Sequence, residues 1–278
     1  MGTVQHKCFS TSVFREVKMK KLINAFLANL DIALVRKSSN EKMLGSSQRF
    51  RAYQLAELID DDLLSNYFSS LPYSKSQLYQ DLFVLSELSF KKNGFFVEFG
   101  ATNGIDLSNT YLLETKFDWS GILAEPAKIW QKEILNNRKA HIELDCVWKS
   151  TGENLQFNEV TDKKHRGELS TIDAFSQIDQ HGNSRKIGHK YEVSTISLQD
   201  LLNKYNAPET IDYLSIDTEG SEYEILNAFD FNTFDVRVIT CEHNYTPARE
   251  RIYDLLTRNG YERKLVEFSL FDDWYVRR

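Results

Sequence analysis

The chain has 278 residues, of which 41% are hydrophobic and 13% aromatic, so it can bury the core of one large domain with an appendage. Its formal net charge of -6 argues against a broad basic surface for nucleic acid or for an anionic membrane. No run approaches the roughly 18 apolar residues of a membrane-spanning helix. We therefore expect a soluble protein with no nucleic-acid partner and no membrane span.

The cysteines and the N-terminal segment bear on location and order. Cys8, Cys146 and Cys241 are far apart and show no metal-ligand spacing, which suits a reducing compartment, and the expected location is cytoplasmic. Residues 1–18 lack sustained periodicity and are expected to be poorly ordered. Apolar residues at helical spacing predict packing helices over 22–35 and 53–64. Residues 1–72 are thus interpreted as an N-terminal extension and helical region.

From Tyr73 onward, strand and helix signals alternate. The predicted strands are 95–99, 121–124, 140–147, 191–197, 211–217, 236–242, 261–267 and 274–277, and the predicted helices are 78–88, 107–116, 129–136, 198–205, 223–229 and 249–259. This alternation predicts one α/β domain over 73–278, with a doubly wound, Rossmann-like, mostly parallel sheet and an antiparallel C-terminal hairpin. The polar stretch between the third and fourth predicted strands is long enough to be an insertion or lid.

The first predicted strand ends in a glycine-containing loop, Gly100-Ala101-Thr102-Asn103-Gly104, which is typical of the first crossover in a nucleotide-binding sheet. A dinucleotide-binding loop would favour a third glycine where Asn103 stands. Glu98, near the end of the apolar strand, is costly to bury without a donor partner. The ammonium group of S-adenosylmethionine is such a donor, and its carboxylate suits free backbone N–H groups in the loop. A glycine loop also serves simply to turn from strand to helix.

The next two strand ends carry further candidates. Glu125 follows Gly100 by 25 positions, near the separation of about 20 residues at which an acidic side chain meets a ribose hydroxyl. The alternative is a solvated carboxylate at a helix start before Pro126. Asp145 is placed to accept from the exocyclic amine of adenine. Cys146 is interpreted as a small buried hydrophobe rather than a nucleophile.

Polar side chains also follow the two strands predicted at 211–217 and 236–242. Asp217 and Glu219 lie at one strand end, and Glu242 and His243 at the next, where adjacent strand ends converge. The carboxylates can bind a divalent cation, act as a base or cap the following helix, and capping is the favoured role for Glu222. A lone histidine is usually structural, but His243 is the candidate base for a hydroxyl nucleophile. Asp217 and Glu242 are the candidates for a divalent metal.

Three segments together resemble the FkbM-like methyltransferases: 96–104 with its glycine loop, 216–222, and Glu242-His243-Asn244. The resemblance covers residue 73 to the C-terminus. It implies a class I methyltransferase fold, S-adenosylmethionine as cofactor, and O-methylation, often of sugar hydroxyls in glycans, polysaccharides or glycosylated natural products. The run 76–81 is similar to a helix of that family, which implies a place for Gln80 near the methionyl end of the cofactor. The residues predicted to bind the cofactor are then Gln80, Glu98, Gly100, Ala101, Thr102, Asn103, Gly104, Glu125, Pro126, Asp145, Cys146 and Asp217.

We expect an S-adenosylmethionine-dependent O-methyltransferase that aligns a sugar-containing acceptor for in-line attack, with His243, Asp217 and Glu219 as the catalytic residues. The alternatives are a nicotinamide-dependent oxidoreductase, against which Glu98 and Asn103 count, and a non-catalytic glycan-binding protein of the same fold. The basic segment 161–190 is interpreted as a solvated loop or as a lid for an acidic acceptor. Residues 1–72 contribute to substrate binding, to a homo-oligomer, or to neither.

Overall fold

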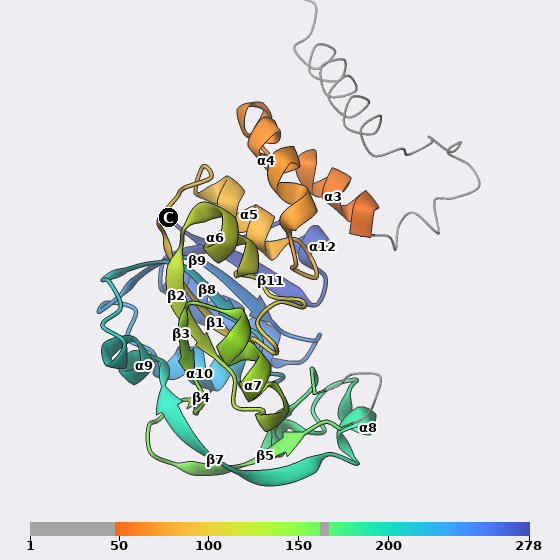
Figure 1. The fold of residues 1–278 in the computed structure, drawn as a ribbon, viewed down its shortest axis with the longest axis vertical. Coiled ribbons are helices and arrows are strands. Elements are labelled where there is room, and N and C mark those ends of the chain that lie inside the picture. The colour runs from red at the N-terminus through yellow and green to blue at the C-terminus, as the bar shows by residue number, and fades with distance from the viewer. Residues whose placement is uncertain (1–47, 162–166) are drawn as a thin grey trace, which may run out of the picture. The chain divides into compact units, whose positions relative to one another are not determined.

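The computed structural model describes residues 48–161 and 167–278 (Figure 1). The extension 1–18, the predicted helix 22–35 and the basic residues 162–166 lie outside these ranges. The chain divides into two compact units, Met1–Arg51 and Ala52–Arg278. Within the described ranges, no helix is long and apolar enough to cross a membrane. The functional division that we expect after residue 72 remains a prediction.

Short helices precede the central sheet. They are α3 (Gln48–Ala56), η1 (Asp61–Leu63), α4 (Leu64–Ser70), η2 (Leu71–Tyr73) and α5 (Gln80–Glu87). The predicted helix 53–64 is wrong in its bounds, because the chain leaves the helix after Ala56 and a new helical turn begins at Asp61. Asp61 and Asp62 stand in the first turn of that new helix, where carboxylates are stabilised by the helix dipole.

A seven-stranded sheet forms the centre of the second unit, in the order β10-β11-β9-β8-β1-β2-β3 (Figure 1). Its strands are β1 (Phe95–Phe99), β2 (Ser120–Ala124), β3 (His141–Glu143), β8 (Thr210–Ile216), β9 (Asp235–Glu242), β10 (Tyr261–Lys264) and β11 (Asp272–Arg277). The pairs β1–β2, β1–β8, β2–β3 and β8–β9 are parallel. β11 runs antiparallel to both β9 and β10. The predicted doubly wound sheet with an antiparallel C-terminal hairpin is confirmed.

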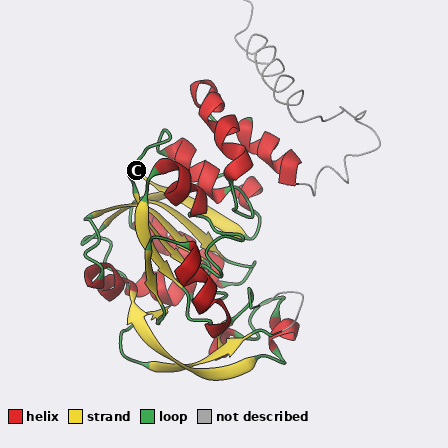
Figure 2. Cartoon of the chain, in the orientation of Figure 1, coloured by secondary structure: helices red, strands yellow, loops and turns green. Residues whose placement is uncertain are grey.

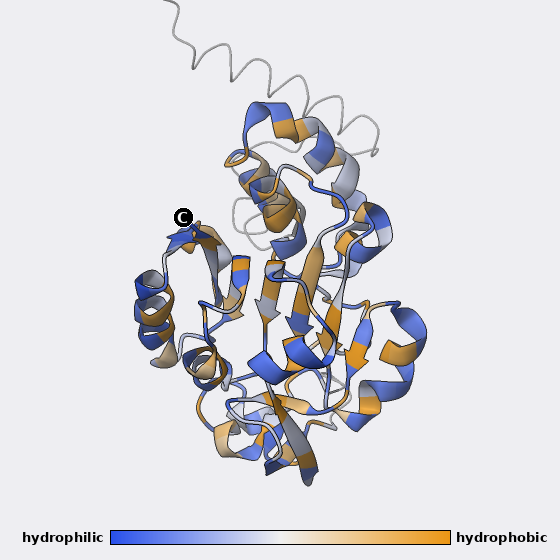
Figure 3. Cartoon of the chain, turned by 90° about the vertical axis from the view of Figure 1, so that its left-hand side faces the viewer, coloured by the Kyte–Doolittle hydropathy of each residue, from blue (hydrophilic) through white to orange (hydrophobic). Residues whose placement is uncertain are grey.

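Helices cover both faces of this sheet, as its apolar strands require. On one face α9 (Leu198–Lys204), α10 (Glu222–Ala228) and α11 (Ala248–Arg258) share a core with the strands. Because side chains alternate along a strand, Tyr275 faces this core and Trp274 faces the other side. There the ring of Phe83, from α5, lies 4.6 Å from the ring of Trp274. Figure 3 shows the apolar strands inside and the polar outer surfaces of the helices.

The helices between the first strands are α6 (Tyr111–Phe117) and α7 (Lys128–Asn137). At the other end of the chain, the predicted strand 261–267 is too long. β10 ends at Lys264, and the short helix α12 (Val266–Ser269) connects it to β11. Leu265 and Leu270 flank α12 with positive φ angles of 48° and 58°, so the chain turns sharply at both ends of the helix.

A second, four-stranded sheet holds the inserted segment (Figure 2). Its order is β4 (Cys146–Trp148), β7 (His189–Ser197), β5 (Asn154–Glu159) and β6 (Thr171–Ile172), with η3 (Asp173–Phe175) and α8 (Gly182–Arg185) between β6 and β7. Two predictions are corrected here. The strand 140–147 is broken into β3 and β4, and the strand 191–197 belongs to this sheet rather than to the central one. The break follows Glu143, whose carboxylate accepts the N–H groups of Leu144 (3.0 Å) and Asp145 (3.1 Å) and so turns the chain.

Candidate active site

A cavity of about 310 Å³ lies at the carboxyl ends of β1, β2, β8 and β9. This size is typical of small-molecule sites. Ten predicted site residues line it: Gln80, Glu98, Gly100, Thr102, Glu125, Pro126, Cys146, Asp217, Glu219 and Glu242. Five others do not: Ala101, Asn103, Gly104, Asp145 and His243.

Gly100 allows two strand ends to approach each other closely. Its φ is +73°, and a Cβ placed on it would lie 1.9 Å from the backbone oxygen of Asp217. Its N–H donates to the carbonyl of Ala124 at 3.1 Å. Glycine adopts this left-handed conformation without strain, and it alone leaves room for the neighbouring carbonyl. The loop after β1 is therefore fixed against the ends of both β2 and β8, beside the cavity.

Five backbone N–H groups in and directly after this loop already donate to acceptors inside the chain, so these five are not free for a ligand. The N–H of Thr102 donates to Glu125 Oε2 at 2.8 Å, and those of Ile105 and Asp106 donate to Asn103 Oδ1 at 2.9 Å each. The N–H groups of both loop glycines donate to carbonyls. Asn103 is thus a turn-forming residue. These five amides do not form a cradle for a pyrophosphate or for a cofactor carboxylate.

Glu98 is buried, with 2% of its surface exposed, and its carboxylate finds donors inside the chain. It accepts hydrogen bonds from Ser108 Oγ (3.0 Å), Asn109 N (2.7 Å) and Thr110 Oγ1 (2.5 Å), and Arg138 Nη1 lies 3.8 Å away. Burial raises the pKa of Glu98, and Arg138 counteracts this shift. The bonds hold residues 108–110 in a turn, so α6 starts at 111 and the predicted start at 107 is wrong. Burial of Glu98 does not require an ammonium partner, and its role in cofactor binding stays a prediction.

Glu125 joins the glycine loop to the end of β2. Its Oε2 accepts the N–H of Thr102, and its Oε1 accepts the N–H of Ala127, both at 2.8 Å. Burial raises the pKa of Glu125 to about 7, and the two backbone hydrogen bonds oppose this shift. Each carboxylate oxygen can accept a second hydrogen bond. Since Glu125 lines the cavity, a pair of ribose hydroxyls is a donor set that fits it.

At the third strand end, the two neighbouring candidates differ. Cys146 lines the cavity, whereas Asp145 does not. The backbone N–H of Asp145 donates to Glu143 in the turn between β3 and β4. The geometry therefore gives no support to an adenine contact through Asp145. Burial raises the pKa of the Cys146 thiol to about 12, in keeping with its interpretation as a buried hydrophobe.

Two side chains in the cavity that can accept hydrogen bonds, Asp272 and Asn109, were not predicted from the sequence. Asp272 Oδ2 accepts from Gln80 Nε2 (3.0 Å) and from Trp274 Nε1 (3.1 Å). Its other oxygen, Oδ1, is buried with no hydrogen-bond partner, and so is Asn109 Oδ1. Both residues line the cavity, and burial raises the pKa of Asp272 to about 8. Because buried polar atoms are normally satisfied, these two oxygens point to a polar ligand, and a positively charged donor would favour the ionised form of Asp272.

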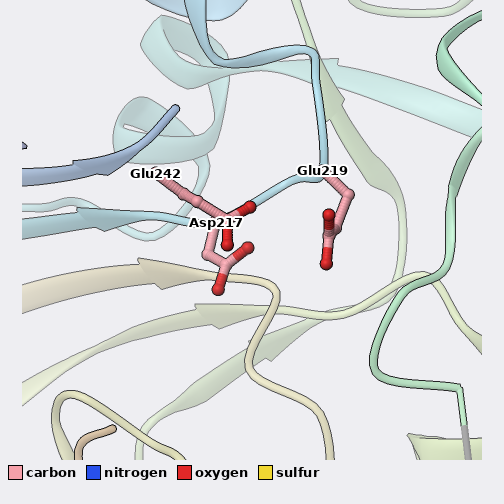
Figure 4. A group of neighbouring side chains, drawn as sticks. All are labelled: Asp217, Glu219 and Glu242. Carbon is pink, nitrogen blue, oxygen red and sulfur yellow. The ribbon is translucent and has the colours of Figure 1, made fainter. Parts of the chain in front are cut away.

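Three carboxylates from two strand ends point toward one another (Figure 4). One oxygen from each of Asp217, Glu219 and Glu242 lies within 4.8 Å of the others. Burial raises the pKa of all three groups, that of Asp217 to about 7. A hydrogen bond between Asp217 and Glu242 lowers the pKa of Asp217 and raises that of Glu242. The shared proton therefore favours Glu242, and Asp217 is the group that ionises first.

Hydrogen bonds from two other side chains hold this carboxylate cluster. Arg185 Nη2 donates to Glu219 Oε2 at 2.7 Å. Asn244 Nδ2 donates to the same oxygen at 3.0 Å and to Glu242 Oε2 at 2.8 Å. Glu222 is engaged elsewhere. Its Oε1 accepts the N–H groups of Thr218 and Gly220, which precede α10, so it orders the loop before the helix and does not cap the helix as predicted. Asn244 stands in the segment that carried the family resemblance, but its bridging role could not be read from the sequence.

His243 is buried outside the cavity lining. Its Nδ1 accepts the N–H of Tyr245 at 3.0 Å, and its Nε2 lies 3.8 Å from Asp273 Oδ1. Burial lowers the pKa of His243 to about 4, so the ring is neutral at physiological pH. The geometry does not support the predicted role of His243 as the base. Its imidazole instead orders the turn 243–245 that presents Asn244 to the carboxylates.

The inserted segment contributes one wall of the cavity, through residues 167–170 and Ile172, Gln180 and His181. Two of its cations are already paired. Arg185 contacts Asp179 and Glu219, and Lys190 Nζ lies 2.8 Å from Asp173 Oδ2. The interpretation as a lid for an acidic acceptor gains no support from these two residues, and the basic residues 162–166 lie outside the described ranges.

The chain is similar to one protein family and to several solved structures. The family model of the Methyltransferase FkbM domain matches residues 98–263. Among solved structures, the chain is similar to Methyltransferase FkbM from Methylobacillus flagellatus KT, with 14% identity and a TM-score of 0.44 over 81% of this chain and 58% of that one. It is also similar to precorrin-6y C5,15-methyltransferase from Geobacter metallireducens GS-15, with 12% identity and a TM-score of 0.34 over 70% of this chain and 85% of that one. A third is a putative RNA methyltransferase from Pyrococcus horikoshii, with 11% identity and a TM-score of 0.34 over 71% and 81%.

No curated protein matches the chain. The chain spans 58% of the length of the Methylobacillus flagellatus protein. The family match runs from the end of β1 into β10, so it includes the glycine loop, the three carboxylates and the inserted sheet. It covers more than half of the chain. With its mostly parallel seven-stranded sheet and antiparallel β11, the chain has the class I methyltransferase fold and belongs to the family of the FkbM methyltransferase domain.

Proposed function

We propose that this chain transfers a methyl group from S-adenosylmethionine to a sugar hydroxyl. The observation that carries the proposal is the acidic lining of the cavity. Among the described residues that line it there is no lysine or arginine, but there are eight carboxyl side chains: Glu98, Asp106, Glu125, Glu168, Asp217, Glu219, Glu242 and Asp272. Burial raises the pKa of several of them, that of Glu125 and Asp217 to about 7 and that of Asp272 to about 8, and a positively charged sulfonium or ammonium group would favour their ionised form. The pyrophosphate of a nicotinamide dinucleotide would be repelled.

Individual residues fit the parts of this cofactor. The unpartnered oxygens of Asn109 and Asp272 suit the methionyl ammonium. Glu125 suits the ribose hydroxyls, and Cys146 and Phe157 offer apolar contact to the adenine. When bound, the cofactor supplies a methyl group attached to a positively charged sulfur, which becomes a neutral thioether after transfer.

The chain itself orients the acceptor hydroxyl and takes its proton at Asp217. A carboxylate with a pKa of about 7 can accept a proton at neutral pH. Alignment of the hydroxyl with the methyl carbon is the larger contribution to rate. The oxygen–methyl bond forms as the sulfur–methyl bond breaks, and the hydroxyl proton ends on Asp217. Asn244 keeps Glu219 and Glu242 in place beside it.

The same three carboxylates would also hold a divalent cation, because carboxylate oxygens are the ligands that Mg²⁺ prefers. The ion would polarise the acceptor hydroxyl and lower its pKa. Dialysis against a chelator separates the two possibilities. Activity that survives dialysis assigns proton removal to Asp217 alone, and activity that is lost and returns with Mg²⁺ assigns a metal to the cluster.

Glu125→Gln tests the cofactor end of the cavity. The amide NH2 group of glutamine would face a backbone N–H that now donates to Glu125, and one acceptor for ribose would be lost. We expect about tenfold weaker binding of S-adenosylhomocysteine by calorimetry, equivalent to ~1.4 kcal/mol. Glu143→Gln is the matched control, because Glu143 also accepts two backbone N–H groups at a strand end but does not line the cavity. Equal affinities of the two variants for S-adenosylhomocysteine would show that Glu125 does not bind the cofactor.

Tyr245→Ala tests the acceptor end. The Tyr245 side chain is 60% exposed and follows Asn244, which lines the cavity. Asn244 and Tyr245 both have positive φ, 44° and 57°, and strain of this kind concentrates at functional sites. An aromatic face offers apolar contact to a sugar ring. We expect the KM for the acceptor to rise about tenfold, or ~1.4 kcal/mol, with unchanged binding of S-adenosylhomocysteine.

The control for this variant is Tyr73→Ala, which removes a ring that is 48% exposed and whose neighbours in the sequence do not line the cavity, unlike Asn244 beside Tyr245. Tyr245 does not contribute to acceptor binding if the acceptor KM stays constant in Tyr245→Ala, or if it rises equally in Tyr245→Ala and Tyr73→Ala.

The proposal as a whole is tested with S-adenosylmethionine that carries a deuterated methyl group. The protein is incubated with this donor and a panel of neutral oligosaccharides, nucleotide-sugars and glycosylated metabolites, and the products are analysed by mass spectrometry. We expect a single labelled methyl group on a neutral sugar. Binding of the cofactor product without transfer to any sugar in the panel would favour the non-catalytic glycan-binding alternative.

A further inference from the structure

One fully buried side chain links the inserted segment to the carboxylate cluster. Arg185, the last residue of α8, has no exposed surface. Its Nη2 donates to Glu219 Oε2 at 2.7 Å, its Nη1 to Asp179 Oδ1 at 2.8 Å, and its Nε to the carbonyl of Leu169 at 2.8 Å. Burying a guanidinium is costly unless it is paired and hydrogen-bonded on all sides. Here two of the three acceptors come from the insertion, and the third is a member of the cluster.

Glu219 depends on contacts from the insertion for its position. Its φ is +59°, a conformation that a residue with a side chain adopts only when its surroundings enforce it. Its carbonyl accepts from Thr171 Oγ1 at 3.0 Å, and its carboxylate accepts from Arg185 and Asn244. Thr171 and Arg185 both belong to the inserted segment. Loss of these two contacts would leave Asn244 as the one side chain of the described ranges that donates a hydrogen bond to Glu219.

Arg185 also offsets the repulsion within the cluster. Three acidic groups whose oxygens lie within 4.8 Å of one another cannot all ionise without compensation. Arg185 lowers the pKa of both Asp217 and Glu219, against the larger effect of burial. None of the described residues that line the cavity is a lysine or an arginine, and Arg185 lies behind Glu219. Its charge therefore acts on the cluster from the insertion side.

The same side chain fixes the wall of the cavity. Leu169, which accepts from Arg185 Nε, lines the cavity together with the neighbouring residues 167–170. A Cβ on Gly220 would lie 2.5 Å from Ile178 Cδ1 and 3.0 Å from Phe175 Cβ, so the loop after β8 and the insertion are packed without space between them. Movement of the insertion would therefore displace both the wall and Glu219.

We propose that Arg185 is a positioning residue for methyl transfer, which holds Glu219 in the carboxylate cluster, compensates its charge and keeps the inserted segment against the cavity. The insertion is then a working part of the active site rather than a solvated loop. This inference rests on the proposed function, but its first test does not require a methyl acceptor.

The test compares Arg185→Gln with the wild type by hydrogen–deuterium exchange in the ligand-free protein. We expect faster exchange of the backbone amides of residues 217–222 in Arg185→Gln, because Glu219 loses its hydrogen bond to the insertion. With the acceptor found by mass spectrometry, kcat should fall about 10–100-fold, as is typical when a residue supporting a catalytic group is lost. S-adenosylhomocysteine should bind about 3–10-fold more weakly, because residues 167–170 line the cavity and lose a contact that holds them.

Asp179→Asn is the matched control. It breaks the other ion pair of Arg185 and loosens the insertion, but leaves the bond to Glu219 intact. We expect reduced thermal stability and faster exchange within the insertion, without faster exchange of residues 217–222. Arg185→Lys keeps the charge with fewer donors, so its exchange over residues 217–222 and its kcat should lie between those of the wild type and those of Arg185→Gln. This variant serves if Arg185→Gln does not fold.

Unchanged exchange of residues 217–222 in Arg185→Gln, or an equal increase in Asp179→Asn, would reduce Arg185 to a structural role and overturn the inference. So would an Arg185→Lys variant with a kcat as low as that of Arg185→Gln. Failure of the wild type to bind S-adenosylhomocysteine is a separate result, which counts against the proposed function and not against the exchange measurement.

Discussion

Asp217→Asn is expected to lower kcat by about 10²–10⁴-fold, the usual contribution of a general base, while S-adenosylhomocysteine binds nearly as well as to the wild type. The wild-type kcat should rise with pH through about 7, because burial raises the pKa of Asp217 to about 7 and the group accepts a proton only when ionised. In the variant, kcat should no longer rise with pH in this range. Steady-state kinetics from pH 5 to 9, about two pH units on either side of 7, would measure both the fall in kcat and the change in its pH dependence.

The control for Asp217→Asn is Asp106→Asn, which also removes a negative charge from the cavity lining but lies outside the three-carboxylate cluster. We expect little change in its kcat or pH profile. Wild-type turnover in Asp217→Asn would show that proton removal is carried by another group or left to solvent.

Gly100→Ala is the second change with a large expected effect. The new Cβ would lie 1.9 Å from the backbone oxygen of Asp217, and backbone cannot move aside as a flexible side chain can. It would also stand at a φ of +73°, where alanine is strained. We expect a loss of more than about 4 kcal/mol in the free energy of unfolding, which only a few mechanisms produce. Chemical denaturation followed by circular dichroism measures it.

The variant Gly152→Ala separates the cost of the left-handed backbone conformation from the cost of the steric clash with Asp217. Gly152 has a similar φ of +84°, but a Cβ there meets nothing within 4 Å. We expect this control to lose about 1–2 kcal/mol, the cost of the left-handed conformation alone. If the two variants were equally stable, the close approach of the β1 loop to the end of β8 would not exist in solution.

The central sheet was largely predictable because its strands are short, apolar and followed by polar residues. β1 has the predicted bounds, β9 begins one residue earlier than predicted, and β8 begins and ends one residue earlier than predicted. The pairing partner of a strand is not encoded locally. Residues 191–197 have the same kind of sequence pattern as the strands of the central sheet. They nevertheless pair with Asn154–Glu159, which lie in the polar stretch where no strand is predicted. The partner decides which sheet a strand joins, and that partner lay in a segment without a strand signal.

The carboxylate cluster was predictable because carboxyl ends of parallel strands meet at one edge of a sheet. The direction of each side chain was not. Glu242 is the last residue of β9 and reaches the cavity, whereas His243 stands in the turn after the strand and does not. Contacts between segments that are far apart in the sequence bring Arg185, Asn109 and Asp272 to the site. Such contacts exist only once the insertion and β11 have packed.

The central claim is that the acidic cavity at the carboxyl ends of β1, β2, β8 and β9 holds S-adenosylmethionine. Its most direct test is calorimetric titration of the full chain with S-adenosylhomocysteine and, separately, with NAD. We predict saturable binding of S-adenosylhomocysteine at one site per chain and no heat of binding with NAD. Binding of NAD without binding of S-adenosylhomocysteine would contradict the claim.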